Sequence, residues 1–221
     1  MTVSTHVHGD QPWHYAGAPL GESPVVVVLL HGRNASPESI LTLAARLERP
    51  HVTFLAPAAA NRTWYPHSFL TDLAGNEPYL SSALSVVVHI VDTLVARGIA
   101  RDRIILGGFS QGACLSLEFA VRHPARYGGL LAFSGGVIGP PGTTWPDSGR
   151  CEGMPVFLGC SDADSHIPKS RVEESAAIFR RMGASVTIRL YPGMGHVINE
   201  DELAEGRAVI DAAGSPTPAT R

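Results

Sequence analysis

The stretch RIILGGFSQGACLSLEFAVRH (Arg103–His123) decides the architecture that the sequence predicts. Its first part, Arg103–Phe109, is an apolar run typical of a buried strand, and Gln111–His123 has the pattern of an amphipathic helix. Ser110 stands at the junction, with a glycine two positions to either side of it. This spacing indicates a strand–turn–helix unit whose turn is too tight for side chains at the flanking positions.

The same alternation of strand and helix extends through the chain on both sides of this unit. β-Branched and apolar runs predict strands at Pro24–Leu30, His51–Ala56, Arg103–Phe109, Gly129–Phe133, Pro155–Cys160 and Val186–Leu190. Helical periodicity and capping residues, Ser36 and Asn199 among them, predict helices at Pro37–Glu48, Glu77–Arg97, Gln111–His123, Lys169–Met182 and Asn199–Ala212. Alternating elements of these lengths predict an α/β fold with a mostly parallel central sheet and helices on both faces.

Length and composition narrow the class of protein. The 221 residues fit one domain, 1–221, in which we expect an irregular segment at 1–20 and a disordered tail at 213–221. A net charge of −3 offers no basic surface for nucleic acid, and the longest apolar run is too short to cross a membrane. Without a signal-peptide pattern, a cytoplasmic location is expected. The three cysteines lack the spacing of a metal site or a disulfide framework.

Polar residues that follow the predicted strands are the candidates for chemistry, because ligands of such sheets bind beyond the carboxyl ends of the strands. A serine, an acid and a histidine occur there in chain order: Ser110, then Asp162 or Asp164, then His196 in the loop PGMGH. A serine nucleophile needs a base, and the base needs an orienting acid. Of the two acids we prefer Asp164, in the segment DSHIP, and expect Asp162 to bond the loop backbone.

An oxyanion formed at Ser110 would need two backbone N–H donors. The residue after the nucleophile, Gln111, supplies one, and Arg33 in the loop HGRNAS is the best candidate for the other. His31, beside Arg33, is expected to support this loop by hydrogen bonding.

Aromatic residues after the strand His51–Ala56 predict the wall of a substrate pocket. Trp64, Tyr65 and Phe69 are expected to bind substrate together with Met194, and Leu70, Trp145, His67 and His166 are further candidates near it. Only about twenty residues separate the fourth and fifth predicted strands, so there is no room for a large cap domain. The site is therefore expected to be shallow, with an apolar rim that is compatible with a homodimer contact.

Four segments, LLHGRNAS, GGFSQGA, GCSDADSHIP and YPGMGH, resemble in order and spacing the signature regions of the carboxylesterase/phospholipase family. That family includes acyl-protein thioesterases and lysophospholipase-like carboxylesterases. The resemblance covers Pro24–Val209 and implies an α/β-hydrolase fold, a triad of Ser110, Asp164 and His196, and an oxyanion hole formed by Arg33 and Gln111 N–H groups. Arg-Asn-Ala after His-Gly departs from the thioesterases, and NRTWYPHSF and GNEPYLSS are closer to a bacterial carboxylesterase branch.

The expected function is that of a serine hydrolase acting on small-molecule carboxylic esters with small to medium acyl chains, with neither a metal nor an organic cofactor. An acyl-thioesterase or a lysophospholipase is the nearest alternative, followed by an acyltransferase. A non-catalytic, ligand-binding member of the fold is the alternative from a different class.

Overall fold

A computed structural model describes residues 6–47, 49–145 and 151–215. Strands and helices alternate along the chain as the sequence predicts. The strands are β1 (Trp13–Gly17), β2 (Val25–Leu30), β3 (Val52–Pro57), β4 (Ile104–Phe109), β5 (Gly129–Phe133), β6 (Pro155–Ser161) and β7 (Ser185–Tyr191). The α-helices are α1 (Pro37–Leu47), α2 (Tyr79–Ala96), α3 (Gln111–Arg122), α4 (Lys169–Arg181) and α5 (Glu200–Gly214), and short 3₁₀ helices lie at Ala60–Arg62, Leu73–Asn76 and Arg101–Arg103.

The seven strands form one sheet in the order β1-β3-β2-β4-β5-β6-β7. All neighbours from β3 to β7 are parallel, and β1 alone is antiparallel, pairing Trp13 with Pro57 and Gly17 with Thr53. The carboxyl ends of the six parallel strands therefore meet at one edge of the sheet. Ser110 follows β4, the central strand, at this edge.

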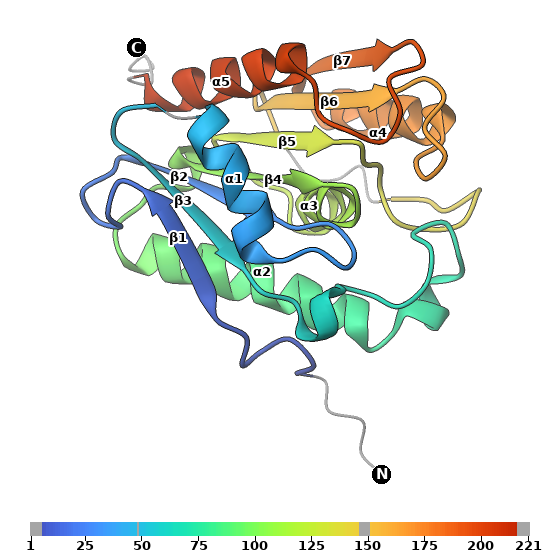
Figure 1. The fold of residues 1–221 in the computed structure, drawn as a ribbon, viewed down its shortest axis with the longest axis horizontal. Coiled ribbons are helices and arrows are strands. Elements are labelled where there is room, and N and C mark those ends of the chain that lie inside the picture. Colours follow the sequence, from blue (N-terminus) through green and yellow to red (C-terminus); the bar gives the residue numbers. More distant parts are fainter. Residues whose placement is uncertain (1–5, 48, 146–150, 216–221) are drawn as a thin grey trace.

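Helices cover both faces of the sheet (Figure 1). α1 and α5 contact each other on one face, and their buried residues form one core cluster with side chains of the strands. α2, α3 and α4 contribute to a second cluster on the opposite face. Sandwiched between these layers, β2 is buried along its whole length, which explains why the sequence VVVVLL shows no polar alternation. The predicted mostly parallel, two-faced α/β architecture is confirmed.

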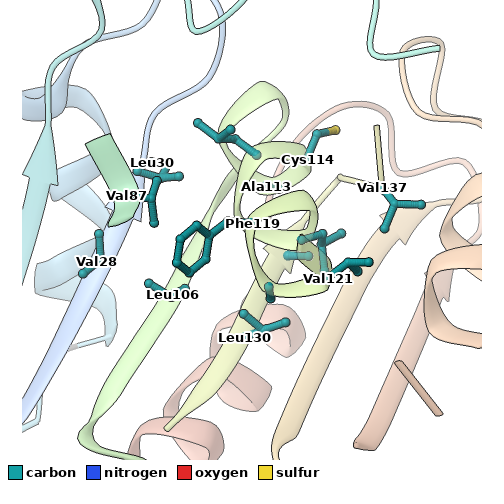
Figure 2. Packing of buried hydrophobic residues seen from close by; sticks show 14 of the residues in the cluster. Val28, Leu30, Val87, Leu106, Ala113, Cys114, Phe119, Val121, Leu130 and Val137 are labelled. Carbon is teal, nitrogen blue, oxygen red and sulfur yellow. The ribbon is translucent and has the colours of Figure 1, made fainter. Parts of the chain in front are cut away.

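The helix after Ser110 is the most deeply packed element of this face. Eleven of the twelve residues of α3 are buried. Figure 2 shows Phe119 and Val121 on opposite sides of α3, and both belong to the buried cluster that includes Leu106 and Leu130 of the strands. Burial of this helix fixes its N-terminal end against the sheet, and with it the position of the turn that carries Ser110.

α2 is long and apolar enough by composition to cross a membrane, with a mean hydropathy of 1.6 over 18 residues. Its apolar side chains nevertheless have a place inside the protein, since Leu80, Val87, Ile90 and Leu94 are fully buried in the core around α3. The composition of α2 is thus explained by its role as a core helix of this fold.

Two expectations about the ends of the chain are wrong. The segment at 1–20 is not irregular throughout, because Trp13–Gly17 forms the edge strand β1. Ala213 and Gly214 belong to α5 rather than to a tail, while the rest of the predicted tail from 216 onward lies outside the described residues. Between β5 and β6, the described residues contain no helix or strand, which agrees with the expected absence of a large cap.

Candidate active site

Ser110 occupies a strained turn between β4 and α3. Its backbone has φ 56° and ψ −119°, a conformation that residues other than glycine adopt only when the surroundings enforce it. Ser110 N–H donates to the carbonyl of Phe133 at 2.9 Å, and Ser110 C=O accepts from Cys114 N–H at 3.0 Å. The turn therefore holds the hydroxyl at the carboxyl edge of the sheet.

The two glycines that flank Ser110 are required by the close approach of β2. A Cβ atom on Gly108 would lie 2.4 Å from the carbonyl oxygen of Leu30, and one on Gly112 would lie 1.9 Å from the same atom. Neither distance is possible for a real side chain, so both positions need glycine. This contact with the Leu30 carbonyl is the physical reason for the G-x-S-x-G pattern in this chain.

A chain of hydrogen bonds joins the three candidate catalytic side chains. The Ser110 hydroxyl lies 2.8 Å from His196 Nε2, and His196 Nδ1 lies 2.7 Å from Asp164 Oδ2. Asp164 is thus the acid that reaches His196. Asp162 instead accepts from the backbone N–H of Gly193 at 2.9 Å and bonds the loop that carries His196.

The Asp164 side chain is fully buried, yet its environment favours the charged carboxylate. Burial opposes its ionisation, but hydrogen bonds from His196 and from the N–H groups of His166 and Ile167 outweigh that effect and hold the pKa of Asp164 below its usual value. The two N–H groups donate to Oδ1 at 2.8 and 3.1 Å, which leaves Oδ2 for His196. Asp164 is therefore a fixed negative charge behind the imidazole.

Two backbone N–H groups are available for an oxyanion near Ser110. The first residue of α3, Gln111, has no intrahelical acceptor for its N–H, as at any helix N-terminus. Within the described residues, Arg33 N–H also donates no hydrogen bond to another group. Arg33, Ser110 and Gln111 line one pocket of about 660 Å³, so both donor residues border the same space as the hydroxyl.

The side chains of the two candidate oxyanion residues hold the pocket wall, a role that the sequence did not reveal. Gln111 Nε2 donates to the carbonyl of Tyr65 at 2.8 Å, and Gln111 Oε1 accepts from Trp64 N–H at 2.9 Å. The Arg33 guanidinium donates to the carbonyls of Pro66 and His67 at 2.8 and 2.6 Å. Hydrogen bonds with Gln111 on α3 and with Arg33 in the loop after β2 thus hold the segment at 63–67 in place.

Tyr65 and Phe69 line the pocket, as expected, and so do His67 and His166. Trp64 does not: it is fully buried, and its indole N–H donates to the carbonyl of His31 at 2.9 Å. The prediction that Trp64 contacts substrate is therefore wrong, because the aromatic ring points into the core instead of the pocket.

Met194 and Trp145 also lie outside the lining of the pocket. The Met194 sulfur accepts from the side-chain amide of Asn199 at 2.9 Å, at the start of α5. Trp145 donates to the buried carboxylate of Glu118 at 3.1 Å and lies beside the guanidinium of Arg171, 5.5 Å from the ring centre. Lining residues that the sequence did not single out include Phe109, Cys114 and Ile167.

Two buried histidines support the site without contacting the triad. His31 Nε2 accepts from Ala59 N–H at 3.2 Å, and its Nδ1 lies 2.8 Å from the Gly32 carbonyl. His8 bridges the N–H of Ala60 and the carbonyl of Trp64, at 3.1 and 3.0 Å. Burial lowers the pKa of both histidines, so each bridges a donor and an acceptor as a neutral ring. Through His8, the N-terminal segment thus stabilises the part of the chain that forms the pocket wall.

The helix that follows His196 begins with a capping box. Asn199 accepts from Glu202 N–H and Glu202 accepts from Asn199 N–H, both at 2.9 Å, which confirms the predicted cap. Glu202 is fully buried, and its Oε1 has no hydrogen-bond partner within the described structure. Burial raises the pKa of Glu202 to about 7. Across the described residues, no group of three or more histidine, cysteine or acidic side chains is arranged to hold a metal ion.

Known proteins share both the sequence and the architecture of this chain. The family described as Phospholipase/Carboxylesterase matches residues 18–212. Acyl-protein thioesterase 1 of Eremothecium gossypii is 34% identical over 177 residues, which cover 74% of this chain and 70% of that protein. Lysophospholipase-like protein 1 of Mus musculus is 24% identical over 214 residues, with 87% and 88% of the two chains covered.

A solved structure gives the same result for the fold. The crystal structure of a phospholipase/carboxylesterase from Dyadobacter fermentans superposes with a TM-score of 0.87 at 36% identity. The match covers 97% of this chain and 100% of that chain. The similarity therefore includes all seven strands and the loops at the carboxyl edge of the sheet.

Proposed function

Because the chain belongs to the phospholipase/carboxylesterase family of the α/β-hydrolase fold, we propose that it is a serine esterase that forms an acyl-enzyme on Ser110. The substrates are carboxylic esters with small to medium acyl chains. The observation that carries the proposal is the hydrogen-bonded sequence Ser110–His196–Asp164, with distances of 2.8 and 2.7 Å. Such a sequence supplies a nucleophile, its base and the group that orients the base.

In the first half-reaction, Ser110 Oγ attacks the ester carbonyl while His196 Nε2 removes the hydroxyl proton. Asp164 fixes the imidazole through Nδ1 and stabilises the imidazolium that forms. The N–H groups of Arg33 and Gln111 donate to the oxyanion of the tetrahedral intermediate. His196 then gives its proton to the leaving alcohol, and the acyl group remains on Ser110.

In the second half-reaction, His196 takes a proton from water, which attacks the acyl-enzyme. The same N–H donors stabilise the second oxyanion, and His196 returns the proton to Ser110 as the acid leaves. Apart from the ester and the water, every group used in these steps belongs to the chain itself.

The size and lining of the pocket support the range of acyl chains. A volume of about 660 Å³ lies within the range of small-molecule sites, and the buried side chains of Tyr65, Phe69, Cys114 and Ile167 form its apolar part. A thioester is the alternative substrate, because a relative that is 34% identical is named an acyl-protein thioesterase.

The test compares wild type, Ser110→Ala and the control Ser170→Ala on p-nitrophenyl esters of two to twelve carbons, with matched acyl thioesters alongside. We expect Ser110→Ala to lose at least about a thousandfold in kcat, and Ser170→Ala, an exposed serine on α4, to keep wild-type rates. A fluorophosphonate should label wild type at Ser110, as located by mass spectrometry. Ester turnover that survives Ser110→Ala would disprove the acyl-enzyme mechanism, and a faster thioester series would favour the alternative.

A further inference from the structure

The pocket beside Ser110 is lined by cationic and imidazole side chains and by no carboxylate. Its described lining includes Arg33, His67, His166 and His196, but neither aspartate nor glutamate. Asp164 lies behind His196 and is bonded to it. The positive charge of this lining contrasts with the net charge of −3 on the whole chain. A negatively charged ligand would therefore meet attraction in the pocket despite the charge of the protein.

Arg33 provides the permanent charge of this lining. Its guanidinium donates to the Thr63 hydroxyl at 3.2 Å and to the carbonyls of Pro66 and His67, all of which are neutral acceptors. No carboxylate lies within ion-pair distance of Arg33 in the part of the chain that the structure describes. By contrast, ion pairs to carboxylates occupy the following arginines: Arg46, Arg49, Arg101, Arg122, Arg171 and Arg189.

The position of the guanidinium is fixed before any ligand binds. Three hydrogen bonds to the segment at 63–67 hold the guanidinium, whose Cζ lies 5.9 Å from the ring centre of Tyr65, another lining residue. A guanidinium has five N–H donors, and these bonds use three of them. Two donors remain for a ligand, and an arginine that is held in advance loses less side-chain entropy when it binds an anion.

A second arginine, Arg62, adds to the positive electrostatic potential near the pocket. Arg62 donates through Nε to the carbonyl of Ala35, a lining residue, at 3.2 Å. Its charge acts on this loop, since it helps to lower the pKa of His31 after the larger effects of burial and the opposing Gly32 hydrogen bond. Arg62 does not itself line the pocket, but its guanidinium is bonded to a loop that does.

We propose that the preferred substrates of this site are short esters that carry a second, anionic group, such as half-esters of dicarboxylic acids, whose carboxylate is recognised by Arg33. This inference rests on the proposed esterase function and specifies its substrate class. The reacting ester carbonyl lies at Ser110 and the N–H groups of Arg33 and Gln111. The carboxylate lies on the Arg33 side chain, with Arg62 adding long-range attraction.

The test measures kcat/KM for pairs of esters that differ only in charge. Monoethyl glutarate is compared with its neutral amide, ethyl 5-amino-5-oxopentanoate, which places the charge on the acyl side. Butyrate esters of 4-hydroxybenzoate and 4-hydroxybenzamide place it on the alcohol side. We expect one of the two anionic esters to react about tenfold faster than its amide at low salt. That ratio should fall severalfold between 20 and 500 mM NaCl, because salt screens charges near a surface.

Variants of Arg33 assign the preference to its charge. Arg33→Met removes the charge and should abolish the preference, while Arg33→Lys should retain part of it. Arg97→Met, at the exposed end of α2, is the matched control and should leave the ratio unchanged. Each ratio compares kcat/KM for an anionic ester with that for its neutral amide. If a substitution of Arg33 also loosens the wall at 63–67, both values fall together and their ratio does not change.

Two results would overturn the inference while the esterase function stands: equal rates on both members of each pair, or an unchanged ratio in Arg33→Met. Failure of wild type to hydrolyse the neutral esters as well would remove the proposed function itself, and the inference with it.

Discussion

The side-chain amide of Gln111 donates to the carbonyl of Tyr65 at 2.8 Å, across 46 residues of sequence. Through its other atom, the amide also accepts from Trp64 N–H. One side chain at the first turn of α3 therefore holds the pocket wall at a fixed distance from the turn that carries Ser110. The wall and the proposed oxyanion hole form a single unit.

Loss of this amide should weaken both stability and turnover. Gln111→Ala leaves the buried N–H of Trp64 without its partner and removes one of the two donors to the Tyr65 carbonyl, which keeps the Thr63 hydroxyl. We therefore expect the free energy of unfolding to fall by about 2 kcal/mol. We also expect kcat/KM on a short ester to fall about tenfold, although the backbone N–H of residue 111 remains. Urea denaturation and steady-state kinetics measure the two effects. Gln11→Ala, in the segment before β1, is the control, and a fully stable, fully active Gln111→Ala would refute the linkage.

Gly112 should tolerate no side chain. Gly112→Ala places a Cβ 1.9 Å from the Leu30 carbonyl oxygen, so α3 or β2 must move, at a cost of at least about 3 kcal/mol. Gly75→Ala is the matched control, because its Cβ would meet only His67 Cδ2, at 3.6 Å. We expect the control to change stability by less than about 1 kcal/mol in thermal unfolding. Equal melting temperatures for the two variants would contradict this account of the glycine pattern.

The two acids after β6 should differ sharply in their effect on turnover. Asp164→Asn removes the charge that orients His196, so we expect kcat to fall by about a thousandfold or more. Asp162→Asn removes the charge but keeps an amide oxygen that can accept from Gly193 N–H, so it should cost less than about tenfold. Steady-state kinetics on a short p-nitrophenyl ester decides the matter. Comparable losses in the two variants would mean that Asp164 has no special role.

Glu202 should make stability depend on pH in the opposite direction from most acids. Its pKa is about 7 in the folded protein and about 4.3 in an unfolded chain, so the unfolded state releases the proton first. Its contribution is fully present below about pH 4.3 and is lost as pH rises through 7, by a total of about 4 kcal/mol. Glu202→Gln stays neutral at every pH and should lack this loss.

The measurement is the free energy of unfolding of both proteins between pH 5 and 8. The difference between wild type and Glu202→Gln should shift in favour of the variant as pH rises. Glu173→Gln, an exposed acid on α4, should run parallel to wild type. Parallel curves for wild type and Glu202→Gln would show that Glu202 titrates normally.

The sequence was sufficient for the parts of the fold that depend on local pattern. Within the described residues, six of the seven strands and all five α-helices were predicted to within about two residues. Buried parallel strands are continuous apolar runs, and the helices begin or end near proline, glycine or a capping polar residue. β1 was not predicted, because its sequence WHYAG is neither a continuous apolar run nor a capped helix. Its extended form depends on pairing with β3. Edge strands of this kind are decided by their neighbour rather than by their own residues.

The same distinction holds within the candidate site. Order and spacing were enough to select Ser110 and His196 and to narrow the acid to Asp162 or Asp164, with Asp164 preferred, because loops at the carboxyl ends of parallel strands converge. The direction in which a side chain points could not be predicted from order and spacing. Trp64 and Tyr65 are adjacent aromatic residues in the sequence, yet only Tyr65 reaches the pocket, and the choice depends on contacts with His31 and Gln111 that are distant in sequence.

The strand order also bears on how the chain can fold while it is being synthesised. β3 and β4 add on opposite sides of β2, and β5, β6 and β7 then each add beside the strand synthesised just before it, on one growing edge of the sheet. A nascent chain can thus build its core progressively, with Ser110 in place once α3 has docked. His196 emerges only after β7, the last strand to join. The nucleophile therefore acquires its base at the final step of assembly, when little of the molecule remains to be made.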